Sequence, residues 1–197
     1  MRRLVLAAFA LALAACEAPP APPRPVPSYK APEFQTADYR RIVLVPFDDE
    51  AGAREQTDAI ARVFGRELEK ATSIEVVPLG HAARVELAPR ESPRRLGTYR
   101  VDAVLDIAAR YGADAVLFGT VTAYRPYSPQ ILGLRAELVS ATSGLVVWSV
   151  EAQFDLSDPT TLSSLALPPG TSDWDSVRVS PGRLAALVSA RAVDTIR

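Results

Sequence analysis

The feature that most constrains the fold is a change in hydrophobic period partway along the chain. Residues 41–47 (RIVLVPF) and 114–122 (DAVLFGTVT) are almost continuously apolar, which is typical of strands buried on both faces. Farther on, the apolar residues alternate with polar ones. The alternating positions are Leu132, Leu134, Ala136 and Leu138, followed by Trp148, Val150, Ala152 and Phe154. The turn ATSG at 141–144 joins these runs, so the sequence predicts a β-hairpin with one buried and one solvated face.

Segments with helical periodicity separate the early strands. Residues 55–71 and 101–111 each carry an apolar stripe, Gly112 stands where a left-handed cap is expected, and Ser180-Pro181 opens a final helix. A short strand is predicted at 74–77. The order is therefore strand, helix, strand, helix, strand, strand, strand, helix. We predict an α/β (α+β) fold, in which helices pack on a mixed five-stranded sheet that is parallel in its early βαβ units and antiparallel in the late hairpin.

The N-terminus has the layout of an export signal. Arg2 and Arg3 precede an uncharged apolar stretch at 4–12, and small residues then lead to Cys16. This segment resembles a bacterial lipoprotein signal peptide, which implies cleavage after Ala15 and attachment of diacylglycerol and an N-acyl chain to Cys16. The residue after the cysteine is not aspartate, and by the same resemblance this favours the outer membrane, with the protein facing the periplasm. The alternatives are an ordinary secretory signal cleaved after Ala15 or an unprocessed anchor.

The predicted anchor is followed by a proline-rich segment and then by one domain. Residues 17–33 hold seven prolines in seventeen positions, which is typical of a stiff, extended spacer. We therefore divide the chain into a signal peptide at 1–15, a lipidated cysteine and tether at 16–38, and a single periplasmic domain at 39–197. At about 3.1 Å per residue, the tether could hold the domain up to roughly 50 Å from the bilayer.

Charge and cysteine content exclude several classes of function. The formal net charge is −1 and becomes more negative once Arg2 and Arg3 are removed, and no basic stripe is present, so nucleic acid is not an expected partner. The single cysteine, Cys16, is predicted to be acylated, which excludes disulfides, thiol catalysis and cysteine-based metal sites. We expect no cofactor apart from the covalent lipid, and no later segment is long and apolar enough to span a membrane as a helix.

Three segments together resemble a known group of domains. They are RIVLVPF followed by a helix, AARYGADAVLFGTV at 108–121, and LVSATSGLVVWS at 138–149. In this order they resemble the periplasmic domain of the curli-secretion channel lipoprotein, of the penicillin-binding-protein activator lipoproteins, and of the N-terminal part of the Tol-Pal propeller protein. Gly112, Gly119 and Gly144 are fold markers in this resemblance. The chain lacks the spare alternating segments from which the curli channel builds its barrel, and Ser140 stands where the group often has an acidic residue.

Few residues are candidates for chemistry. The only histidine, His81, has no second histidine for a metal pair, and no nucleophile elbow is present. Asp48, Asp49 and Glu50 lie beyond the first strand, where α/β folds often bind ligands. They could hold a cation, although a solvated loop that supplies negative charge to a helix N-terminus explains them as well. We predict that the protein is not an enzyme.

Aromatic residues near the hairpin form a candidate partner surface. Tyr124, Arg125 and Tyr127 precede the hairpin, and Trp174 lies in a predicted irregular loop at 156–179. Tyrosine and arginine are typical interface anchors, although these side chains could equally pack the loop onto the sheet. We expect a membrane-anchored binding or scaffolding lipoprotein that regulates or assembles a cell-wall synthesis or secretion complex. The alternatives are a subunit of an oligomeric envelope ring or channel, and a small-ligand binder or enzyme that uses the 48–50 loop.

Overall fold

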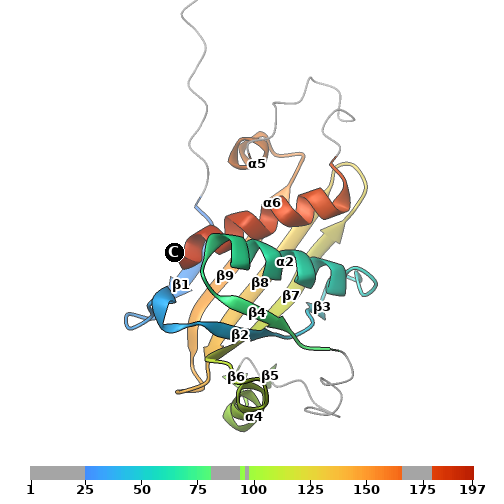
Figure 1. The fold of residues 1–197 in the computed structure, drawn as a ribbon. Helices are drawn as coiled ribbons and strands as arrows, with labels where there is room; N and C mark the ends of the chain where they lie inside the picture. The colour runs from blue at the N-terminus through green and yellow to red at the C-terminus, as the bar shows by residue number, and fades with distance from the viewer. Residues whose placement is uncertain (1–24, 81–93, 96–97, 166–178) are drawn as a thin grey trace, which may run out of the picture.

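Strands and helices follow one another much as the hydrophobic pattern predicts (Figure 1). A computed structural model describes residues 25–80, 94–95, 98–165 and 179–197. The strands are β1 (Ser28–Lys30), β2 (Arg41–Leu44), β3 (Asp48–Asp49), β4 (Glu75–Pro78), β5 (Arg94–Arg95), β6 (Thr98–Tyr99), β7 (Ala115–Arg125), β8 (Ile131–Ser140) and β9 (Val146–Asp155). The helices are α2 (Thr57–Ala71), α4 (Val101–Tyr111), α5 (Pro159–Ser164) and α6 (Pro181–Val193), with short 3-10 turns η1 (Thr36–Asp38) and η2 (Asp194–Ile196).

The main sheet is mixed, as predicted. Its strand order is β1-β9-β8-β7-β2-β4, and β3 pairs separately with β7. The pairs β2–β4 and β2–β7 are parallel, as βαβ units require, whereas β7–β8 and β8–β9 are antiparallel. Strand β4 therefore ends the sheet on one side, and β9 with the short β1 ends it on the other.

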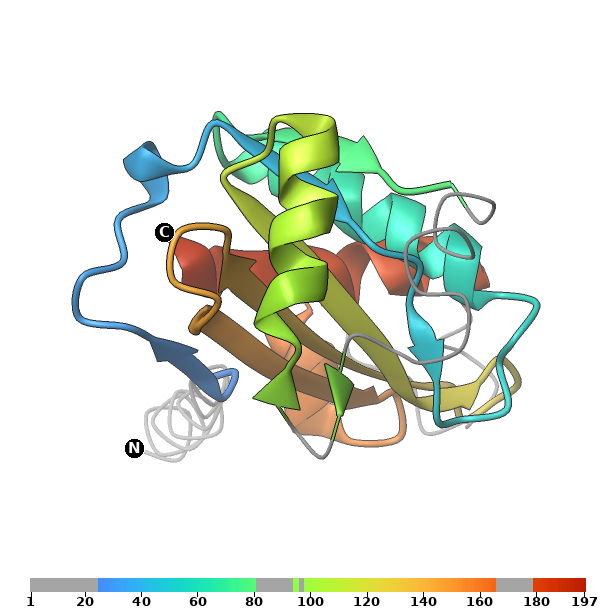
Figure 2. The same ribbon diagram turned by 90° about the horizontal axis from the view of Figure 1, so that it is seen from below.

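Helices cover the two faces of the sheet unequally. Helices α2 and α6 lie side by side on one face, and α4 crosses the other (Figures 1 and 2). Strand β2 and the first part of β7 are buried along almost their whole length, because they lie between the two helical layers. This position explains why their sequences are continuously apolar.

The alternating strands β8 and β9 turn one row of side chains toward α2 and α6. Trp148, Leu134 and Leu138 are fully buried on that side. On β9, Glu151 and Gln153 point to the opposite face and are exposed. At the hairpin turn the amide of Gly144 donates to the carbonyl of Ser140 over 2.9 Å, so the predicted hairpin and its facing are confirmed.

The structure corrects several details of the prediction. The sheet has seven strands rather than five, because the two short strands β1 and β3 also belong to it. Strand β1 lies within the predicted tether and pairs with β9. Asp48 and Asp49, predicted as a turn, pair with β7 as β3. The predicted loop at 156–179 contains α5, which Asp158 caps by accepting a hydrogen bond from the amide of Thr160.

Candidate functional site

Several predicted site residues lie outside the described part of the chain. These are the cleavage residue Ala15, the lipidation residue Cys16, the single histidine His81 and the loop tryptophan Trp174. Their predicted roles remain predictions. Among the residues that the structure describes, no helix combines the length and the hydropathy needed to cross a membrane.

The carboxylates at 48–50 are engaged in local structure. Asp49 Oδ1 accepts hydrogen bonds from the amides of Ala53 (2.8 Å) and Ala51 (3.0 Å). These backbone hydrogen bonds, led by that from Ala53, lower the pKa of Asp49, because they stabilise its ionised form. The carboxylate therefore holds the loop that leads from β3 toward α2.

Glu50 faces a cation of the chain itself. Its Oε2 lies 3.6 Å from a guanidinium nitrogen of Arg135 on β8. Within the described ranges, no group of three His, Cys, Asp or Glu side chains is placed to hold a metal ion. Of the two explanations offered by the sequence, the geometry favours a loop that orders the start of α2.

The residues of the predicted aromatic surface have different environments in the structure. Tyr124 is half-buried against the core, and burial raises the pKa of its hydroxyl. The Arg125 side chain donates to the carbonyl of Pro129 within its own loop. Arg125 is exposed, and Tyr127 extends furthest into solvent among the described residues of this surface, with 79% of its area exposed. Tyr124 thus packs the loop onto the sheet, and a contact patch here is reduced to the tip of the loop.

A buried amide that the sequence did not single out fixes this loop. Gln130 is 4% exposed, and its Nε2 donates to the carbonyls of Pro126 (3.0 Å) and Val179 (2.9 Å). Its Oε1 accepts from the amide of Val179 over 3.2 Å. Gln130 therefore ties the β7–β8 connection to the segment that enters α6. No local motif marks such a residue, because its partner lies 49 positions away.

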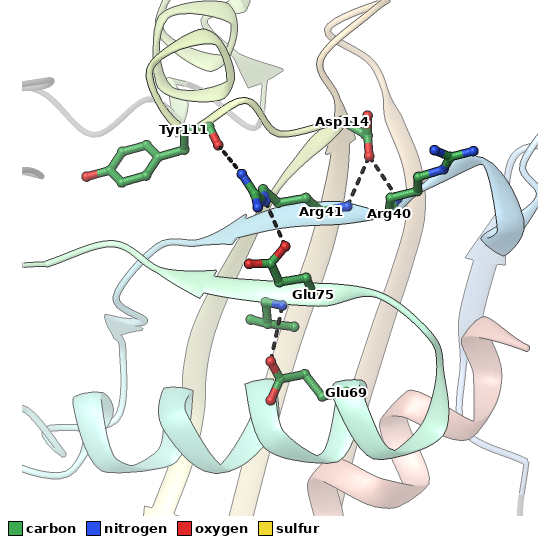
Figure 3. Close-up of polar contacts among 7 residues, drawn as sticks. Arg40, Arg41, Glu69, Glu75, Tyr111 and Asp114 are labelled. Atoms are coloured by element: carbon green, nitrogen blue, oxygen red, sulfur yellow. Dashed lines mark hydrogen bonds and ion pairs between the residues drawn. The ribbon is translucent and has the colours of Figure 1, made fainter.

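A polar network ties together the start of β2 and its two neighbouring strands (Figure 3). The Asp114 carboxylate accepts hydrogen bonds from the amides of Arg40 (2.8 Å) and Arg41 (3.0 Å). Arg41 Nε donates to Glu75 Oε2 over 2.8 Å. These groups are exposed, so the network aligns the parallel strands and contains no sequestered catalytic pair.

Two hollows lie at opposite edges of the sheet. The first, which we call the α2–β4 groove, has a volume of about 330 Å³ and is lined by Leu44, Arg62, Gly65, Arg66, Glu69, Val76 and Pro78. The second, the acidic cleft, has a volume of about 390 Å³. Its lining comprises Pro25, Val26, Pro27, Glu151, Ala152, Gln153, Phe154, Asp155, Asp158, Thr161 and Ser164. Sequence patterns did not indicate either hollow, because each is assembled from separate elements.

Comparison with known proteins gives no family but a clear fold. No protein-family model matches the sequence, and no curated protein matches it. Among solved structures, the chain is similar to PelC from Paraburkholderia phytofirmans, solved as a dodecamer, with a TM-score of 0.57 and 15% identity over 87% of this chain and 96% of that one.

Two further solved structures match over a smaller part of the chain. GNA1162, a lipoprotein from Neisseria meningitidis, gives a TM-score of 0.45 and 22% identity over 58% of this chain and 81% of that one. The C-terminal domain of LpoB from Salmonella enterica gives 0.38 and 17% over 58% and 82%. Both TM-scores are below 0.5, so these two matches show a partial likeness of fold and nothing more.

Proposed function

We propose that this protein is a non-enzymatic lipoprotein of the bacterial outer membrane whose periplasmic domain assembles with copies of itself. The observation that supports self-assembly best is the likeness to PelC. It extends over 96% of a chain that was solved as a dodecamer. The oligomeric ring, an alternative in the sequence analysis, becomes the leading proposal. A binding or scaffolding protein that regulates or assembles a cell-wall synthesis or secretion complex becomes the second.

The way the N-terminal segment packs sharpens the proposal. Val26 and Phe34 pack against the core, and Thr36 Oγ1 donates to the carbonyl of Ile196 over 2.9 Å. Only the residues between Cys16 and Pro25 then separate the lipid from the domain. Fully extended, they span at most roughly 35 Å, which is less than the tether length inferred from composition. The proposed assembly would therefore sit close beneath the membrane, with neighbouring copies held at similar heights.

Light scattering of the full-length protein, extracted from membranes in detergent, tests the self-assembly. We expect a protein mass that is a multiple of the chain mass and stays constant over a ten-fold dilution. A mass of one chain at all concentrations would remove the ring proposal.

Membrane fractionation tests the anchor separately. We expect Cys16→Ala to release the protein from the outer membrane, because each buried methylene contributes about 0.8 kcal/mol to retention and the variant carries no acyl chain. Cys16→Ser is the matched control, since it also lacks the thiol but alters the residue least. Retention of both variants in the membrane would refute lipid anchoring through this residue.

A further inference from the structure

We infer that β1, at one edge of the main sheet, pairs antiparallel with β1 of a second copy, so that two sheets join across a two-fold axis. This inference rests on the proposed self-assembly and names one surface through which it occurs. Each chain has one such edge, so the contact is self-complementary and joins the copies in pairs. The assembly then contains an even number of chains.

The opposite edge of the sheet is closed to a further strand. On the β2 side of β4, the amide of Glu75 donates to the carbonyl of Arg40 over 2.8 Å. The backbone groups of Val76 and Pro78 alternate with those of Glu75 and therefore point outward. The Val76 amide already donates to Glu69 Oε1 over 3.2 Å (Figure 3), and Pro78 has no N–H. Strand β4 therefore has no free outward amide for a neighbour's strand.

The backbone of β1, by contrast, is open on its outer side, away from β9 (Figure 1). On the inner side, the amide of Ala31 donates to β9 over 2.9 Å, and the carbonyl of Pro27 accepts a hydrogen bond from β9 over 3.0 Å. Because the direction of these bonds alternates along a strand, the N–H and C=O groups of Ser28 and Lys30 point outward. Both residues are exposed, and no backbone hydrogen bond among the described residues engages these groups.

One register satisfies these outward groups in both copies. When Tyr29 lies opposite Tyr29 of the second copy, Ser28 of each copy faces Lys30 of the other, and the two exchange N–H···O=C bonds. A shift by two residues in one direction places the two Lys30 side chains opposite each other and sets Ser28 against Pro32, which has no N–H. A shift in the other direction sets Lys30 against Val26, which packs against the core of its own chain.

The exposed tyrosine of β1 fits this register. Tyr29 is 52% exposed, and the strand pairing places it in line with Glu137 of β8, on the sheet face that α4 crosses. In the proposed pair the two tyrosines are directly opposed at a non-hydrogen-bonded position, where side chains approach most closely. Their rings then stack across the axis. Lys30 does not oppose the contact, because its ammonium group donates to the carbonyl of Arg197 in its own chain.

The predicted lipid anchor brings these edges close to one another. The first described residue, Pro25, lies three residues before β1, so β1 is the strand nearest along the chain to the acylated Cys16 of the proposed function. Short tethers on one membrane raise the effective concentration of one edge around another. A pairing of three residues buries far less than the about 800 Å² per partner of a standard interface, so the contact depends on this shared attachment.

Disulfide cross-linking in isolated membranes tests the inference on the full-length protein. Directly opposed residues at a non-hydrogen-bonded position have Cα atoms about 4.5 Å apart, which is within the range for a disulfide. We expect Tyr29→Cys to give a cross-linked pair of chains for most of the protein under a mild oxidant. The matched control is Glu151→Cys, exposed on the same sheet face. Its two copies would lie roughly 14 Å apart, at three strand spacings, and should not cross-link.

A second pair of variants tests the backbone pairing itself. Added to Tyr29→Cys, the change Lys30→Pro removes the outward amide that would donate to Ser28 of the second copy, whereas Lys30→Ala keeps it. We expect Lys30→Pro to lower the cross-linked fraction roughly ten-fold and Lys30→Ala to leave it unchanged. Thermal unfolding shows whether each domain is intact. If Lys30→Pro unfolds the domain, the two cysteine variants decide alone.

The outcomes separate this inference from the proposed function. An assembled wild type in which Tyr29→Cys does not cross-link, or in which Glu151→Cys cross-links equally, would overturn the inference and leave the proposed function standing. Cross-links that a folded Lys30→Pro variant retains in full would overturn the strand pairing. A wild type that light scattering finds as one chain, together with no cross-link from Tyr29→Cys, would overturn both.

Discussion

The two faces of the main sheet differ in the helices that cover them and in the size of the apolar cluster beneath. On the face under α2 and α6, the large core cluster includes buried residues of β2, β7, β8 and β9. On the other face, α4 covers a smaller cluster centred on β2 and β7, and the outward rows of β8 and β9 carry charged and amide groups. The first face makes the fold stable, while the second leaves polar surface available. The hydrophobic period of each strand follows from this difference.

The largest expected effect on stability comes from truncating a core side chain on the face that α2 and α6 cover. Trp148 is fully buried, and its Nε1 donates to Thr195 Oγ1 over 3.2 Å. We expect Trp148→Ala to lower the free energy of unfolding by about 3–5 kcal/mol, through lost burial and a new cavity. Gln153→Ala, on the opposite face of the same strand, should change it by less than about 0.5 kcal/mol. Urea unfolding measures both, and equal losses would contradict the contrast between the faces.

The anchor of α4 should give the next largest effect. Phe118 is 8% exposed, and its ring stacks on Tyr99 with centroids 4.4 Å apart. We expect Phe118→Ala to lower the free energy of unfolding by about 3 kcal/mol, at the lower end for a buried phenylalanine. Tyr99→Phe keeps the ring stack and removes the hydroxyl that donates to Glu137, so it should cost less. A larger loss for Tyr99→Phe would show that the polar bond, rather than ring packing, holds this face.

Substitutions at two glycines distinguish the cost of backbone strain from the cost of a steric clash. Gly52 and Gly144 both have positive φ, 73° and 68°. A Cβ on Gly52 would meet nothing within 4 Å, whereas one on Gly144 would lie 2.6 Å from Val101 Cγ1, at the start of α4. We expect Gly52→Ala to cost about 1 kcal/mol and Gly144→Ala about 2 kcal/mol, because the left-handed strain is common to both. Thermal unfolding measures the difference, and equal costs would mean that α4 shifts freely over the hairpin turn.

The smallest effect depends on pH. The pKa of Asp49 is lowered in the folded protein, so its ionised form stabilises the fold above the unfolded pKa of about 3.9. That stabilisation is lost as the pH falls through the folded value. Asp49→Asn should therefore lower Tm slightly at pH 7, and the difference from wild type should vanish in strong acid. A difference that persists unchanged below about pH 2 would assign the effect to loop geometry rather than to charge.

The main helices and strands could be predicted from the sequence because each depends on local signals. Helix α4 has the predicted bounds, 101–111, and Gly112 adopts the left-handed conformation, with φ 58°, that its position implied. Ser180 caps α6 through its hydroxyl, which accepts from the amide of Arg183. In these cases periodicity and capping chemistry act over a few residues, so the sequence alone carries the information.

The missed elements depend on distant partners. Strand β1 is three exposed residues after a proline-rich run, and only its pairing with β9 makes it a strand. Asp158-Pro159, an N-cap followed by a first-turn proline, is a local signal for α5. The signal was missed because the helix has only six residues and a composition typical of a loop. The groove and cleft could not be predicted, because each brings together residues from separate elements at a sheet edge. The same holds for the buried amide of Gln130.

Native mass spectrometry of the full-length protein released from membranes tests the central claim most directly, because it reads acylation and assembly in one spectrum. The account predicts one species made of several chains, each beginning at Cys16 and carrying diacylglycerol and an N-acyl chain. A single chain, or an assembly of chains without acyl groups, would contradict it.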